Sequence, residues 1–139
     1  MRFFDTNVLL YSISGKQGEE EKRSIAEALL QQQGCALSVQ VLQEFYVQAT
    51  RPSRPDALSH RMAAAFVESW TRFRVQDMTV PILRHALRLK ERYGFSYWDC
   101  TIVAAACASS CDALYSEDLS HGQVVEGVHI VNPFVGANR

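Results

Sequence analysis

Near its start the chain reads Arg2-Phe3-Phe4-Asp5-Thr6-Asn7-Val8-Leu9-Leu10-Tyr11, in which two short apolar runs flank a polar turn. The first run is typical of a β-strand, and Asp5-Thr6-Asn7 carries the side chains that make turns and cap helices. The second run predicts a helical turn. The segment therefore predicts a strand, an acid at its carboxyl end and then a helix, which is the repeating unit of an α/β fold.

The same alternation continues along the chain. Further strands are predicted at residues 35–37, 73–78, 113–115 and 128–131, and helices at 19–33, 39–50, 58–70, 80–93 and 97–111. Loops are marked by glycine and proline, most clearly in Arg51-Pro52-Ser53-Arg54-Pro55 and between Gly122 and Gly127. Alternating strands and helices predict a parallel sheet flanked by helices.

Length and composition limit the possible functions. At 139 residues and 47% hydrophobic, the chain fits one compact domain spanning residues 1–139. A net charge of -1 and a pI near 6.4 argue against coating nucleic acid by bulk electrostatics, although they permit a local basic rim. No apolar run has the length of a signal-peptide core or a membrane span, so we expect a cytoplasmic protein without membrane contact. The four cysteines fit reduced, buried thiols, because no neighbouring residue completes a zinc site.

Four acids far apart in the sequence each follow a short apolar run or open a helix: Asp5, Glu44, Asp99 and Asp118. The carboxyl ends of parallel strands meet along one edge of a sheet, so these acids are candidates for a shared crevice. Four carboxylates in one pocket would repel one another unless one or two Mg²⁺ or Mn²⁺ ions kept them ionised. The pattern indicates hydrolysis of a phosphodiester.

Three of the four acids also have a purely structural interpretation. Asp5 can make a turn or cap a helix, and Asp99 stands three residues after Ser96, which is the spacing of a capping box. Glu44 points about 130° away from the apolar stripe of its helix, as a solvated glutamate or a residue at the edge of a cleft would do. These alternatives stay open on the sequence alone.

Polar neighbours of the acids are candidates for supporting roles. Asn7 is placed to fix Asp5, and Ser116 offers a hydroxyl beside Asp118. Glu117 is an alternative to Asp118 in the pocket. His121, in the same loop, either positions substrate or is a surface histidine.

Two further pairs are candidates for substrate contact. Tyr97 and Trp98 can stack on unpaired bases, although such aromatics more often belong to a core. Arg51 and Arg54 flank the proline loop and can bind a phosphate backbone, although a solvated face is the commoner meaning of such clusters.

These motifs together resemble one known family. Phe4-Asp5-Thr6-Asn7-Val8-Leu9, the helix of Glu44, Tyr97-Trp98-Asp99 and Leu114-Tyr115-Ser116-Glu117-Asp118-Leu119 resemble the PIN-domain nucleases, in particular the VapC toxins of bacterial type II toxin-antitoxin systems. The resemblance implies a three-layer fold with a central parallel sheet of strand order 3-2-1-4-5. It also implies an endoribonuclease that uses Mg²⁺ or Mn²⁺ at Asp5, Glu44, Asp99 and Asp118.

The resemblance extends to partners. It implies a homodimer, an RNA substrate and a cognate antitoxin that masks the acids with a basic side chain. Operator DNA would be bound only through the antitoxin.

Two other functions are considered. A phosphatase of the haloacid-dehalogenase type would use Asp5 as a nucleophile, but it usually has a second Asp where this chain has Asn7. A non-catalytic module would use the acidic pocket to bind a basic peptide, without metal and without cleaving RNA.

Overall fold

The computed structural model describes residues 1–137, so the last two residues of the predicted domain lie outside the described part of the chain. Its helices are α1 (Thr6–Ser12), α2 (Glu20–Leu30), α3 (Val39–Ala49), α4 (His60–Trp70), α5 (Val80–Tyr93) and α6 (Tyr97–Ala108). Its strands are β1 (Arg2–Phe4), β2 (Cys35–Ser38), β3 (Arg74–Gln76), β4 (Ala113–Tyr115), β5 (Val124–Val125) and β6 (Val128–Val131). The alternation predicted from the sequence is confirmed.

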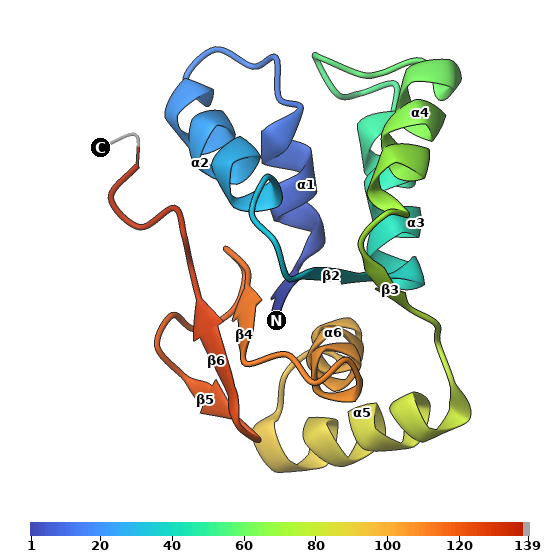
Figure 1. Ribbon diagram of the computed structural model, residues 1–139, viewed down its shortest axis with the longest axis vertical. Coiled ribbons are helices and arrows are strands. Elements are labelled where there is room, and N and C mark those ends of the chain that lie inside the picture. Colours follow the sequence, from blue (N-terminus) through green and yellow to red (C-terminus); the bar gives the residue numbers. More distant parts are fainter. Residues whose placement is uncertain (138–139) are drawn as a thin grey trace.

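The strands form one sheet in the order β3-β2-β1-β4-β6-β5 (Figure 1). All neighbouring strands are parallel except β5 and β6, which are antiparallel. The five predicted strands therefore have the expected order 3-2-1-4-5, and β5 is an addition at the edge. The sequence analysis left residues 124–125 in a loop. They pair with β6 through a tight turn in which Glu126 and Gly127 both have positive φ, as two-residue hairpins require.

The helices lie on both sides of the sheet. In Figure 1, α5 and α6 lie below β2 and β3, and α1 to α4 lie above these two strands. Phe3, Leu114 and Ile130, on three adjacent strands, are at most 1% exposed, so the core runs through the sheet. Within residues 1–137, no helix combines the length and apolar character needed to cross a lipid bilayer.

Two helix boundaries differ from the prediction for identifiable reasons. The first helix begins at Thr6 rather than Val8, because the Asp5 side chain accepts the Thr6 N–H and caps it. The last helix ends at Ala108 rather than residue 111, because Ser110 adopts a left-handed conformation with φ of 56°. The first boundary bears on the candidate site, because Asp5 is the N-cap residue of α1.

Candidate active site

All four predicted acids line one pocket of about 110 Å³. Asp5 follows β1, Glu44 lies on α3, Asp99 lies in the first turn of α6, and Asp118 follows β4. Strands β1 and β4 are parallel neighbours with Phe4 opposite Tyr115, so the residues after each strand emerge at the same edge of the sheet. The remaining lining residues are Thr6, Asn7, Leu10, Gln48, Trp98 and Ile102.

Asp5 is the most buried of the four acids, with 5% of its surface exposed. Its Oδ1 accepts the Thr6 N–H at 2.7 Å, and its Oδ2 accepts the Ser116 hydroxyl at 2.7 Å. Burial raises the pKa of Asp5 from 3.8 to about 6, although the two hydrogen bonds oppose this and the charges of Asp118 and Glu44 add to it. A cation in the pocket would reduce the free-energy cost of burying the charged carboxylate of Asp5.

Glu44 is held in place by both of its carboxylate oxygens. Oε1 accepts the Gln40 side-chain amide at 3.0 Å, and Oε2 accepts the Thr6 hydroxyl at 2.8 Å. The Gln40 carbonyl oxygen in turn accepts the hydroxyl of the buried Thr101 at 2.7 Å. Helices α1, α3 and α6 are thus joined through Glu44, which leaves the solvated interpretation without support.

Supporting roles for Thr6, Gln40 and Thr101 were not predicted from the sequence. Gln40 had a usable signal, because it lies four residues before Glu44 and such pairs are neighbours on a helix. Thr101 had none, since its partner is 61 residues away in the sequence.

Asp99 combines the two interpretations considered for it. Its backbone N–H donates to the Ser96 hydroxyl at 3.2 Å, so Ser96 caps α6 as the sequence predicts. The Asp99 carboxylate also lines the acid pocket. Burial raises its pKa, the Ser96 hydrogen bond lowers it, and the charges of Asp118 and Glu44 raise it.

The structure separates Asp118 from Glu117. Asp118 lines the pocket and accepts the Asn7 amide at 3.2 Å, while its own N–H donates to Ser116 at 3.1 Å. Glu117 accepts the Tyr11 hydroxyl at 2.6 Å and Lys22 Nζ at 2.7 Å. Glu117 therefore braces the loop from outside the pocket.

Of the residues predicted to contact substrate, only Trp98 lines the acid pocket. Trp98 is 63% exposed, whereas the partly buried Tyr97 packs on the core with its ring edge-on to Trp98 at 5.1 Å. Arg51 is exposed, and Arg54 Nε lies 2.8 Å from Asp56. His121 Nδ1 accepts the Asn132 N–H at 2.9 Å and does not line the pocket.

The donors in the pocket suit a hard divalent cation. Within residues 1–137, no three Asp, Glu, His or Cys side chains lie close enough as they stand to bind one metal ion. Four carboxylates without thiol or imidazole are nevertheless the ligands that Mg²⁺ and Mn²⁺ prefer. Burial is the main cause of the raised pKa values of Asp5 and Asp99, and the charges of Asp118 and Glu44 raise both pKa values further.

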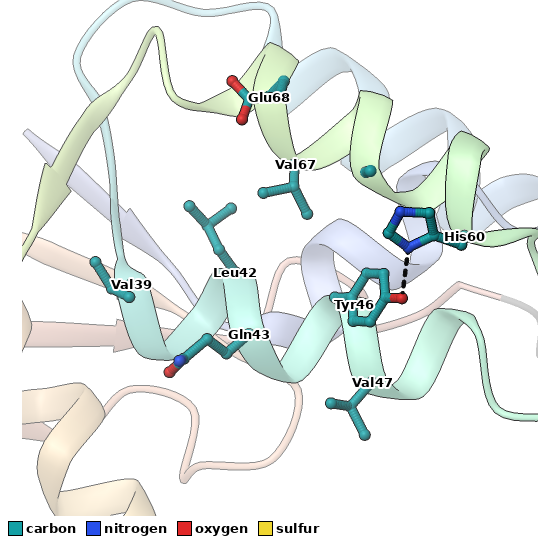
Figure 2. Close-up of a pocket in the computed structure, with 9 residues that line it drawn as sticks. Val39, Leu42, Gln43, Tyr46, Val47, His60, Val67 and Glu68 are labelled. Carbon is teal, nitrogen blue, oxygen red and sulfur yellow. Dashed lines mark hydrogen bonds between the residues drawn. The ribbon is translucent and has the colours of Figure 1, made fainter.

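A second hollow lies on the other side of α3, between α3 and α4 (Figure 2). Its volume is about 490 Å³, and Leu42, Val47 and Val67 give it an apolar wall. The Tyr46 hydroxyl lies 2.7 Å from His60 Nδ1 at its rim. None of the four predicted acids lines this larger hollow.

Comparison with solved structures gives the same fold repeatedly. A toxin-antitoxin complex from Klebsiella pneumoniae has a chain that is 20% identical with a TM-score of 0.69, covering 96% of this chain and 98% of that one. VapC20 of Mycobacterium tuberculosis, described as a sarcin-ricin loop cleaving toxin, is 20% identical with a TM-score of 0.66, covering 85% and 92%. FitAcB from Neisseria gonorrhoeae is 17% identical with a TM-score of 0.66, covering 96% and 99%. A search of curated proteins found no match.

The family assignment comes from the sequence itself. The profile of the PIN domain matches residues 2–126, which include all four acids of the pocket. The chain therefore belongs to the PIN domain family.

Proposed function

We propose that this protein is a Mg²⁺- or Mn²⁺-dependent endoribonuclease and the toxin of a VapBC-type toxin-antitoxin pair. The observation that carries the proposal is the meeting of Asp5, Glu44, Asp99 and Asp118 in one pocket of a PIN domain chain. The structural neighbours support it, since they include a toxin that cleaves the sarcin-ricin loop and a toxin-antitoxin complex.

The residues of the pocket have distinct tasks in this reaction. Asp5, Glu44, Asp99 and Asp118 would hold the ion, which when bound lowers the pKa of water and neutralises charge on the scissile phosphate. Ser116 and Thr6 orient the Asp5 carboxylate, and Gln40 orients Glu44. In-line attack by water leaves a 5′-phosphate and a 3′-hydroxyl, without a covalent bond to the protein.

The partners follow from the same proposal. Single-stranded or loop RNA is the substrate, because its bases can leave their stacks and contact the exposed Trp98. A cognate antitoxin would mask the acids with a basic side chain and bind operator DNA through a separate part. The toxin would act in the cytoplasm as a homodimer.

Cleavage of RNA tests the proposal directly. Purified protein is incubated with a panel of cellular RNAs in Mg²⁺, Mn²⁺ or EDTA, beside Asp5→Asn and Asp99→Asn. Asp77→Asn is the matched control, because Asp77 is exposed and lies outside the acid pocket. We expect metal-dependent cleavage by the wild type and the control only, with 5′-phosphate ends.

Three results would reject the proposal. Ends carrying 2′,3′-cyclic phosphate would contradict attack by water, and cleavage in EDTA would contradict the metal. A phosphorylated Asp5 would favour a phosphatase. As a cellular check, expression of the wild type should arrest growth, expression of Asp5→Asn should not, and co-expression of the antitoxin should restore growth.

A further inference from the structure

One face of α3 carries a polar stripe that runs outward from the acids. Gln40, Glu44 and Gln48 are spaced by four residues each, which places them within an arc of about 80° on the helix, and Arg51 lies beyond the helix end, two residues after Ala49. The first two are joined to each other and to Thr6 and Thr101 by hydrogen bonds. In the described part of the chain, the side chains of Gln48 and Arg51 have no hydrogen-bond or ion-pair partner, so both are free to bind a ligand.

Trp98 faces the same pocket from α6. Trp98 is 63% exposed, which is the largest exposed fraction among the large exposed hydrophobic residues described. The ring of Tyr97 stands against it at 71° and 5.1 Å, and Tyr97 itself packs on the core. Trp98 is therefore supported from behind while its ring remains open to solvent, next to an unpartnered amide.

An aromatic face and a free amide beside the proposed phosphodiester site suit the binding of a nucleobase. A base stacks on an aromatic ring whatever its identity, and a glutamine amide can donate to and accept from the edge of one base at once. Leu10 and Ile102 add apolar surface to the pocket, which suits a flat heterocycle. Arg51 is an exposed cation just beyond the end of α3, where its backbone N–H donates to the Gln48 carbonyl oxygen at 3.3 Å, and it suits the next phosphate.

We propose that Trp98 and Gln48 form a nucleobase subsite beside the scissile phosphate, in which Trp98 stacks on the base and Gln48 reads its edge. Arg51 binds a phosphate further along the strand. The subsite rests on the proposed ribonuclease function and adds to it the residue that sets base preference. A protein partner that covers Trp98 instead is an outcome that the test distinguishes.

Steady-state cleavage of short RNAs tests the subsite through two pairs of variants. Gln48→Ala is compared with Gln43→Ala, an exposed glutamine on the opposite side of α3, and Trp98→Ala with Met62→Ala, an exposed apolar residue on α4. We expect Trp98→Ala to raise KM about 10-fold with kcat within about twofold, and Trp98→Phe to recover most of the loss. Gln48→Ala should reduce the preference among bases at one position about 10-fold, while both controls match the wild type.

Abasic substitution locates the base. RNAs carrying one abasic nucleotide at successive positions should show a single position, next to the cleaved bond, that raises KM as much as Trp98→Ala does. In Trp98→Ala that position should no longer matter, because the stacking partner is already absent.

Binding without cleavage separates this proposal from the ribonuclease function. The chain has two tryptophans, and Trp70 is 5% exposed, so RNA added in EDTA should quench the fluorescence of Trp98. Cleavage with unchanged KM and base preference in Trp98→Ala and Gln48→Ala would overturn the subsite and leave the function standing. Lost antitoxin binding in Trp98→Ala with unchanged KM would also overturn it. Quenching by RNA without cleavage under any metal would reject the function and keep the base site.

Discussion

Helix α3 presents two faces that lead to two different hollows. Glu44 and Gln48 line the small acid pocket, whereas Leu42 and Val47 line the larger hollow, where Leu42 points toward α4 (Figure 2). The larger hollow is the more apolar, and it holds none of the four acids. The difference teaches that the candidate site is recognised by the chemistry of its lining and not by the size of the cavity.

The largest effect should follow from removing the central carboxylate. Asp5→Asn keeps the size of the side chain and its place beside Ser116 but removes the charge that would hold a cation. We expect kcat to fall about 1,000-fold, measured on a cleavable RNA at saturating Mg²⁺. Leu42→Val on the opposite face should keep activity within about twofold, and equal losses in the two variants would mean that only stability was being measured.

The charged form of Asp5 should lower the stability of the metal-free protein, although the same charge is expected to be needed for activity. Its pKa is raised from 3.8 to about 6, so the folded state binds this proton more tightly than the unfolded chain. Its contribution to stability is therefore full below the unfolded pKa and is lost as the pH rises through about 6, a change of up to about 3 kcal/mol. Urea unfolding between pH 4 and 8 in EDTA measures it.

Asp5→Asn provides the comparison for this pH dependence. The variant should be more stable than the wild type at pH 8 in EDTA, and added Mg²⁺ should stabilise only the wild type. A wild type whose stability rises from pH 4 to 8 by the same amount as that of Asp5→Asn would show that Asp5 is not destabilised by burial.

A smaller difference should separate the two adjacent acids of the loop after β4. Asp118→Asn removes a carboxylate from the pocket, and we expect about a 100-fold loss of activity. Glu117→Gln and Tyr11→Phe weaken a brace outside the pocket, and each should cost at most about 10-fold, seen mainly as a higher Mg²⁺ requirement. If Glu117→Gln proved the more damaging variant, the assignment of Asp118 to the ion would be wrong.

The smallest effects should come from two glutamines on different faces of α3. Gln40→Ala frees one oxygen of Glu44, and we expect the Mg²⁺ concentration for half-maximal activity to rise about 10-fold. Gln43→Ala removes an exposed side chain and should change neither that value nor stability by more than about 0.5 kcal/mol. Identical Mg²⁺ titrations would show that the hydrogen bond of Gln40 does not support Glu44.

The sequence predicted the fold well because its signals are local. The first strand is indicated by Phe3 and Phe4 before Asp5. The end of α5 is indicated by Gly94, and the start of α6 by Ser96. The two-residue strand β5 was missed, since it is too short for any periodicity and its turn uses Glu126 where Asn or Asp is usual.

The site was predictable in part. The four acids were identified, and the structure gathers them, while their catalytic roles remain predictions. Periodicity could not decide whether Glu44 faces solvent or a cleft. One of its partners, Gln40, lies on α3 itself, but the other, Thr6, lies on α1 and is brought to Glu44 by tertiary packing. The choice between Glu117 and Asp118 likewise depended on Lys22 and Tyr11, more than ninety residues away in the sequence.

Anomalous diffraction from crystals soaked in Mn²⁺ tests the central claim most directly, since it locates the ion without reference to activity. We predict a peak in the acid pocket about 2.0–2.3 Å from oxygens of Asp5 and Asp99, absent from Asp5→Asn crystals. An empty pocket at a Mn²⁺ concentration that saturates RNA cleavage, or a peak that survives in Asp5→Asn, would contradict it.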